Sequence, residues 1–143
     1  MKIALLGYGK MGKTIEKIAL QRGHSIVIKT SLSSGYKITD ADIAIDFSIP
    51  DAAVHNISHC INNNIPVISG TTGWLDNYNN ITDLVKEKNG AFIYASNFSL
   101  GVNIFFELNK QLAKMMSNLS NYNVSLEEIH HTEKLDAPSG TAI

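Results

Sequence analysis

The chain has 143 residues, of which 44% are hydrophobic, and its formal net charge at neutral pH is −1. This length can bury one good core, and the interspersed charges give no indication of binding to nucleic acid or to a membrane surface. No apolar run approaches the ~20 residues that a membrane-spanning helix needs, and Cys60, the only cysteine, excludes an intrachain disulfide.

The chain starts with a short strand pattern, residues 2–6, followed by a G-x-G-x-x-G motif and then by a helical pattern. A glycine motif between a strand and a helix is typical of a dinucleotide site. In such a site Gly7 permits the tight turn, Gly9 lets the backbone approach a pyrophosphate, and Gly12 lets helix and strand pack closely. The alternative is a glycine-rich turn in an α/β protein that binds no nucleotide.

Strand and helix patterns then alternate along the chain. Strands are expected at residues 25–29, 42–46, 66–69 and 91–95, and helices from Pro50 and over residues 75–88. The polar stretch 30–40 is too short and too broken for a proper crossover helix. Repeated strand–helix units predict a parallel sheet with right-handed crossovers.

Polar residues and glycines follow the carboxyl ends of the first, third, fourth and fifth strands, and in an open parallel sheet ligands bind at that edge. The segment Gly70-Thr71-Thr72-Gly73 offers hydroxyl and backbone N–H groups, although a tight turn is the alternative. The Asn97 side-chain amide can hydrogen-bond a carboxamide such as that of nicotinamide. The alternative is that Asn97 serves only as a cap or turn residue.

The pattern changes after Leu100-Gly101. Residues 102–119 predict a long amphipathic helix, and residues 123–129 predict a strand with His130 at its end. A domain boundary with a hinge is expected near residues 99–101. It divides the chain into a dinucleotide-binding domain, residues 1–100, and the N-terminal part of a substrate-binding domain, residues 101–143.

The last seventeen residues hold the densest group of chemically active side chains. His130 and His131 can exchange protons near neutral pH, and Lys134 supplies a fixed cation. The Pro138-Ser139-Gly140-Thr141 turn is expected to begin a helix, whose free N–H groups attract an anion. Together they predict a pocket for a carboxylated substrate beside a proton donor. A surface histidine pair and an ordinary turn are the alternative.

The second strand ends in Lys29-Thr30-Ser31 and carries no acid. Sites that prefer NAD usually have an Asp or Glu about 20 residues after the glycines, and its carboxylate hydrogen-bonds the ribose. We therefore expect Lys29 to tolerate or favour a 2′-phosphate, because no carboxylate is there to repel it, and NADPH to be used at least as well as NADH.

His55 and His59 lie four residues apart on an expected helix, beside Cys60. Such a pair can hold a metal only with further ligands. No third ligand of matching spacing is present in the sequence, so we favour a solvated face and expect no metal site.

The chain resembles the dihydrodipicolinate reductase family, also called 4-hydroxy-tetrahydrodipicolinate reductases, over residues 1–143. The motifs that carry the resemblance are residues 7–12, 46–48, 70–73, 97–103 and, most specifically, 128–142. It implies a Rossmann-like α/β nucleotide domain with a parallel sheet, followed by the start of an α+β substrate and oligomerisation domain. It also implies NAD(P)H-dependent reduction of a small cyclic dicarboxylate imine in lysine and diaminopimelate biosynthesis, by a cytoplasmic homotetramer.

The resemblance implies roles for individual residues. The matching catalytic residues are His130, the proposed acid, and Lys134, a second proton donor and cation. The matching substrate-binding residues are His131, Ser139, Gly140 and Thr141. The cofactor-binding set is Gly7, Tyr8, Gly9, Lys10, Met11, Gly12, Phe47, Ser48, Gly70, Thr71, Thr72, Ala95, Ser96, Asn97 and Phe98, which Lys29 joins by the argument above.

Members of the family continue beyond the segment that matches the end of this chain, so the resemblance predicts a fragment or a truncated product. The 143-residue chain is expected to bind NAD(P)H weakly or moderately, not to bind pyridine-2,6-dicarboxylate tightly, and to have negligible reductase activity. Two alternatives stay open. One is another Rossmann-type reductase of amino-acid metabolism, and the other is an inactive nucleotide-binding remnant.

Overall fold

The chain divides into two compact units, Met1–Ala95 and Ser96–Ile143. The computed structural model describes residues 1–31, 36–38, 40–130, 132, 137–139, 141 and 142. The division places Ser96, Asn97 and Phe98, all expected to bind the cofactor, in the second unit.

The first unit is built on a parallel sheet with strand order β2-β1-β3-β4-β5, as the alternating pattern predicted. The strands are β1 (Lys2–Leu6), β2 (Ser25–Thr30), β3 (Ile43–Asp46), β4 (Val67–Ser69) and β5 (Phe92–Tyr94). Leu6 is in register with Asp46, which in turn is in register with Ser69. The loops that follow β1, β3 and β4 therefore leave the sheet at the same edge.

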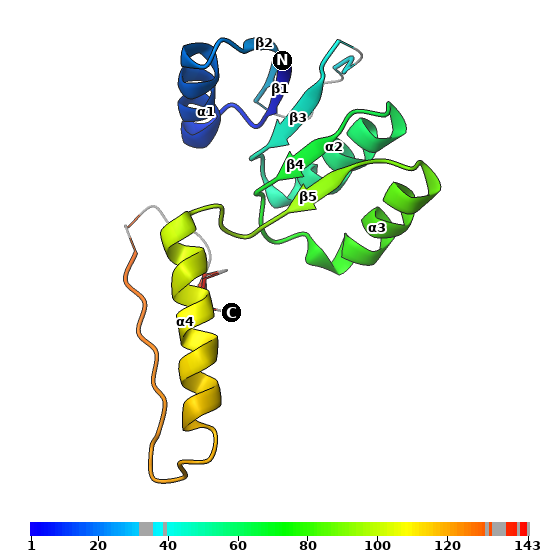
Figure 1. Ribbon diagram of the computed structural model, residues 1–143. Helices are drawn as coiled ribbons and strands as arrows, with labels where there is room; N and C mark the ends of the chain where they lie inside the picture. The colour runs from blue at the N-terminus through cyan, green and yellow to red at the C-terminus, as the bar shows by residue number, and fades with distance from the viewer. Residues whose placement is uncertain (32–35, 39, 131, 133–136, 140, 143) are drawn as a thin grey trace. The chain divides into compact units, whose positions relative to one another are not determined.

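Helices cover both faces of this sheet, which makes the first unit Rossmann-like. They are α1 (Lys10–Gln21), α2 (Pro50–Asn62) and α3 (Tyr78–Glu87), and Figure 1 shows α1 beside β1 and β2 and α2 beside β3 and β4. Side chains of β1 alternate between the faces, as the pleat requires. Ile3 and Leu5 pack with Ala19 of α1, whereas Ala4 and Leu6 belong to the larger cluster with α2.

The helix expected over residues 75–88 is divided into a 3₁₀ turn, η1 (Leu75–Asn77), and α3. Trp74, immediately before it, is buried and its indole N–H donates to the Thr71 carbonyl oxygen at 2.7 Å. Its ring also packs edge-on against Tyr94, 5.3 Å away. Such 3₁₀ turns are frequent at helix N-termini.

The second unit is dominated by α4 (Leu100–Met116), which begins two residues before the expected position. Ser99 caps the helix, since its Oγ accepts the Val102 N–H at 3.5 Å. Every residue of α4 is described and none is buried. Six of its large apolar side chains are 51–77% exposed; they are Leu100, Ile104, Phe105, Leu108, Leu112 and Met115.

The strand expected over residues 123–129 is not formed, so this prediction is wrong. A strand needs a hydrogen-bonded neighbour for its backbone N–H and C=O groups. Within the described part of the second unit no strand pairs with this segment. Val124 and Ile129 are 92% and 86% exposed, so the apolar pattern of the segment is not buried.

Candidate nucleotide-binding and catalytic sites

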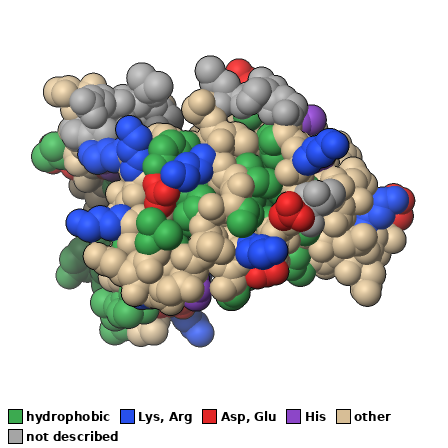
Figure 2. All heavy atoms as spheres, turned by 90° about the horizontal axis from the view of Figure 1, so that it is seen from above, with side chains coloured by type: hydrophobic (Ala, Val, Ile, Leu, Met, Phe, Trp, Pro, Cys, Tyr) green, Lys and Arg blue, Asp and Glu red, His purple; other side chains and the backbone are tan. Residues whose placement is uncertain are grey.

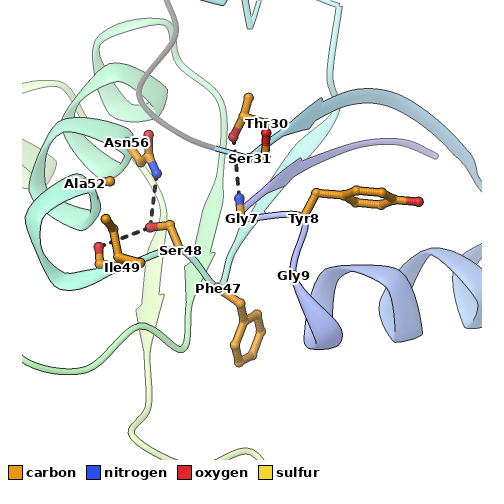
Figure 3. A pocket seen from close by; sticks show the side chains of 10 residues that line it. All are labelled: Gly7, Tyr8, Gly9, Thr30, Ser31, Phe47, Ser48, Ile49, Ala52 and Asn56. Atoms are coloured by element: carbon orange, nitrogen blue, oxygen red, sulfur yellow. Dashed lines mark hydrogen bonds between the residues drawn. The ribbon is translucent and has the colours of Figure 1, made fainter. Parts of the chain in front are cut away.

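A hollow of about 220 Å³ lies where the strand order reverses. The chain runs from β1 through α1 to β2 on one side, and β3, β4 and β5 follow on the other. Ligands bind at such a switch point in open α/β sheets. The lining residues, which Figure 3 shows, are Gly7, Tyr8, Gly9, Thr30, Ser31, Phe47, Ser48, Ile49, Ala52 and Asn56.

The glycine loop has the geometry that the motif predicts. Gly7 has a φ of +92°, and its N–H and that of Tyr8 both donate to the Thr30 carbonyl oxygen, at 3.0 and 2.8 Å. A Cβ on Gly12 would lie 2.4 Å from the Gly7 oxygen, so the glycine lets α1 approach β1 closely.

Gly9 differs from the other two glycines, because a Cβ there would meet no atom within 4 Å. It is also the N-cap of α1, and no side chain caps that helix end. The first N–H groups of α1 are therefore left for an external acceptor, and the helix dipole favours a negative one. These features fit the diphosphate of a dinucleotide.

A buried carboxylate joins the loops around the hollow. Asp46 is fully buried and accepts hydrogen bonds from Asn56 Nδ2 (3.0 Å), Ser69 Oγ (2.8 Å) and Thr71 Oγ1 (2.8 Å). The Thr71 hydroxyl also accepts the Ser48 N–H at 2.9 Å. Thr71, which was expected to contact the cofactor, thus uses its hydroxyl to hold the β3 and β4 loops together.

Asp46→Ala is expected to lower the free energy of unfolding by about 2–4 kcal/mol, because three buried donors lose their acceptor. Asp51→Ala is the matched control. That carboxylate is exposed in the first turn of α2, and its loss should cost at most about 1 kcal/mol. Urea denaturation of both variants measures the difference, and equal costs would show that the Asp46 bonds contribute nothing.

An ionic cluster lies beside the glycine loop. Lys29 Nζ is 2.5 Å from Glu16 Oε1 and 5.0 Å from the centre of the Tyr8 ring, and the Tyr8 hydroxyl donates to Glu16 Oε2. Hydrogen bonds from Lys29 and then Tyr8 hold the pKa of Glu16 below its ordinary value, and Glu16 raises the pKa of both partners. The expectation that no carboxylate faces Lys29 is therefore wrong, since α1 supplies one.

The remaining residues predicted to bind the cofactor lie on several different elements of the two units. Lys10 and Met11 are exposed on the first turn of α1, and Thr72 is half-buried. The Ala95 N–H donates to the Ser69 oxygen at 3.3 Å, beside the β4 loop. In the second unit Asn97 Oδ1 accepts the Ser99 N–H at 2.8 Å, so this oxygen serves the turn before α4.

In the second unit the Glu128 carboxylate links two predicted site residues, His130 and Ser139. Glu128 Oε2 lies 3.0 Å from His130 Nε2, and Oε1 accepts the Ser139 N–H at 2.9 Å. The bonds from Ser139 and then His130 lower the pKa of Glu128 to about 2. The turn at Ser139 therefore already holds one carboxylate.

Three of the predicted residues of this second site, His131, Lys134 and Gly140, lie outside the described residues. Thr141 is described, and its N–H donates to Ser139 Oγ at 3.2 Å. The described residues 141 and 142 form a turn, closed by the bond from Ala142 N–H to the Ser139 oxygen at 2.9 Å, where a helix was expected.

Sequence reasoning assigned no role to Asp46, Glu16 or Glu128. Each acts through partners that come from other segments, and no local motif marks such pairings. A carboxylate at the end of a buried strand was the one available signal, and it applies to Asp46 alone.

The described residues contain no group of three or more His, Cys, Asp and Glu side chains placed to hold a metal ion. The rings of His55 and His59 stack 6.0 Å apart, and His59 Nε2 lies 3.2 Å from the Tyr36 oxygen. Within the same part of the chain, no helix combines the length and the apolar character needed to cross a membrane. On the face in Figure 2, basic and acidic side chains are interspersed.

Two models of one protein family match successive parts of the chain. The model of the dihydrodipicolinate reductase N-terminus matches residues 24–98, more than half of the chain, and that of the C-terminus matches residues 101–143.

Three relatives carry the name 4-hydroxy-tetrahydrodipicolinate reductase. The relative from Christiangramia forsetii is 58% identical over 100% of this chain and 61% of its own length. The relative from Methanocaldococcus jannaschii is 35% identical over 97% of this chain and 46% of its own length. The relative from Thermosipho africanus is 33% identical over 100% of this chain and 64% of its own length. The chain thus spans less than two thirds of each relative.

A solved structure of an Archaeoglobus fulgidus protein assigned as a homoserine dehydrogenase is also similar. It has a TM-score of 0.54 and 16% identity, and the match covers 66% of this chain and 42% of that one. This likeness concerns the fold, which is that of a parallel sheet with flanking helices.

Proposed function

Because the chain belongs to the dihydrodipicolinate reductase family, we propose that it serves in the NAD(P)H-dependent reduction of 4-hydroxy-tetrahydrodipicolinate to tetrahydrodipicolinate. The observation that carries the proposal is its similarity, along its whole length, to a reductase of that name. The substrate is a small cyclic dicarboxylate, and the pathway is lysine and diaminopimelate biosynthesis.

Five of the proposed nucleotide-binding residues line the hollow at the switch point; they are Gly7, Tyr8, Gly9, Phe47 and Ser48. The open side of Gly9 and the free N–H groups of α1 suit the diphosphate, with Gly7, Tyr8, Lys10, Met11 and Gly12 around it. The residues assigned to the nicotinamide end are Gly70, Thr71, Thr72 and the segment 95–98, and Phe47 and Ser48 complete the cofactor-binding set. The reduced nicotinamide supplies a hydride when it is bound.

The second unit supplies the proton and holds the substrate. Reduction of a conjugated imine raises the electron density on the ring, and a positioned acid must provide a proton. We assign this step to His130, whose Nε2 lies 3.0 Å from Glu128, with Lys134 as a second donor. His131, Ser139, Gly140 and Thr141 bind the substrate carboxylates, and the bond from Ser139 N–H to Glu128 supports this role.

The family supports a pyridine nucleotide as cofactor. We further propose that NADPH is used at least as well as NADH. Lys29 stands at the end of β2, where a cation favours a 2′-phosphate, although Glu16 offsets part of its charge. Titration of both nucleotides measures the preference, and a clear preference for NADH would refute this part of the proposal.

The remaining features of the proposal concern the assembly. Residues 1–100 form the dinucleotide-binding domain, and residues 101–143 contribute to a substrate-binding and oligomerisation domain. The protein is proposed to be cytoplasmic and to form a homotetramer. The exposed apolar side chains of α4 support self-association, because such surfaces are usually covered by protein.

The experiment that tests the function measures substrate-dependent oxidation of NADPH and NADH by a protein that carries this sequence. Freshly prepared 4-hydroxy-tetrahydrodipicolinate should support turnover, and open-chain keto and imino acids should not. Turnover limited to an open-chain substrate would indicate a different amino-acid reductase. Nucleotide binding without turnover on any of them would indicate a binding remnant.

A further inference from the structure

The cluster of Tyr8, Glu16 and Lys29 connects three different segments beside the proposed nucleotide site. Tyr8 belongs to the glycine loop and lines the hollow, and Figure 3 shows its side chain extending from that loop along α1. Glu16 lies in the second turn of α1, where side chains lean toward the helix N-terminus. Lys29 is the penultimate residue of β2, next to Thr30 of the lining.

None of the ten described residues that line the hollow is charged. Lys29 is the charged residue adjacent in sequence to the Thr30-Ser31 side of the lining, and the Glu16 carboxylate lies 2.5 Å from its ammonium group. The Glu16 side chain is 18% exposed and that of Lys29 is 44% exposed, so solvent screens the carboxylate less than the ammonium.

We propose that Glu16 is a specificity-determining residue, which neutralises Lys29 and so lets the site accept nucleotides with or without a 2′-phosphate. This inference rests on the proposed function, because it requires a nucleotide whose ribose lies at the end of β2. A phosphate monoester carries about −1.5 to −2 charges at neutral pH, whereas a ribose 2′-hydroxyl carries none. Glu16 therefore repels the phosphorylated nucleotide while Lys29 attracts it.

The protonation of the cluster supports this role. Hydrogen bonds from Lys29 and Tyr8 keep the pKa of Glu16 below its ordinary value, so the carboxylate stays ionised at neutral pH. The Tyr8 hydroxyl fixes the other carboxylate oxygen, and the Lys29 ammonium also lies over the Tyr8 ring. The opposed charges are thus held beside the glycine loop before any ligand binds.

The test compares dissociation constants for NADPH and NADH in the wild-type chain, Glu16→Gln, Lys29→Met and the double variant. Glu16→Gln should tighten NADPH binding roughly three- to fivefold relative to NADH, the scale of one partly exposed charge pair. Lys29→Met should shift the ratio in the opposite direction by a similar factor. The double variant should return near the wild-type ratio, because both charges are then absent.

Two controls separate this role from a structural one. Glu107→Gln removes the carboxylate of a similar ion pair, 2.7 Å from Lys110 in α4, and should leave the ratio unchanged. Raising the salt concentration should shrink the effect of Glu16→Gln, because the interaction is electrostatic.

An unchanged NADPH-to-NADH ratio in a Glu16→Gln variant that binds both nucleotides would overturn the inference and leave the proposed function intact. Equally weakened binding of NADPH and NADH in Glu16→Gln would overturn the inference in the same way. If the folded wild-type chain bound neither nucleotide, the proposed function would fail and the inference with it.

Discussion

Replacing His130 with Ala in a protein that carries this sequence is expected to lower turnover of the proposed reaction about 10²–10⁴-fold, the usual contribution of a general acid. Nucleotide affinity should stay close to that of the wild type, because His130 lies in the second unit and the glycine loop in the first. The His130 ring is held by Glu128 at 3.0 Å, in the segment that resembles the family most specifically. Steady-state kinetics combined with nucleotide titration measure both quantities.

The matched control for this prediction is His55→Ala. His55 is an exposed histidine of α2 that does not line the hollow, so its loss should leave turnover unchanged. Lys134→Ala is expected to behave like His130→Ala, although Lys134 lies outside the described residues. Near-normal turnover in both the His130 and the Lys134 variants would remove the basis for the catalytic assignment.

Gly7→Ala is expected to destabilise the first unit by about 3 kcal/mol or more, through backbone strain and overpacking. Gly7 has a φ of +92°, and a Cβ there would lie 2.2 Å from the Phe47 carbonyl oxygen. Both atoms belong to loops that border the hollow, so the β1 and β3 loops must separate to admit the methyl group. Nucleotide binding should be lost together with stability.

Gly23→Ala separates the two causes. Gly23 also has a positive φ, +76°, but a Cβ there would meet no atom within 4 Å. In this variant the free energy of unfolding should fall only by the cost of the backbone strain, about 1–2 kcal/mol. Urea denaturation of both variants measures the difference. If Gly7→Ala cost no more than Gly23→Ala, the close approach of the two loops would not constrain the site.

The sequence predicted the parts of the fold that depend on neighbouring residues. The strand, glycine loop and helix at residues 2–21 follow from one motif, and Pro50 marks the start of α2. The alternating pattern also predicted the edge at which the proposed site lies, because parallel strands place their carboxyl ends together.

The remaining features depend on contacts between distant segments. The Asp46 network joins β3, β4 and α2, and the Glu16 carboxylate reaches Lys29 from a helix. Neither is visible in a local pattern, so the acid beside Lys29 was missed. The pattern of residues 123–129 matched a strand, but strand formation requires a partner that a local pattern does not provide.

The most direct test of the account is a calorimetric titration of NADPH and NADH into the wild-type chain and into Gly9→Ala. A methyl group on Gly9 meets no protein atom within 4 Å, so thermal stability should stay close to that of the wild type. The methyl group would occupy the space proposed for the diphosphate. We predict saturable binding to the wild type and none, or far weaker binding, to Gly9→Ala. Equal binding by the two proteins, or no binding by a folded wild-type chain, would contradict the account.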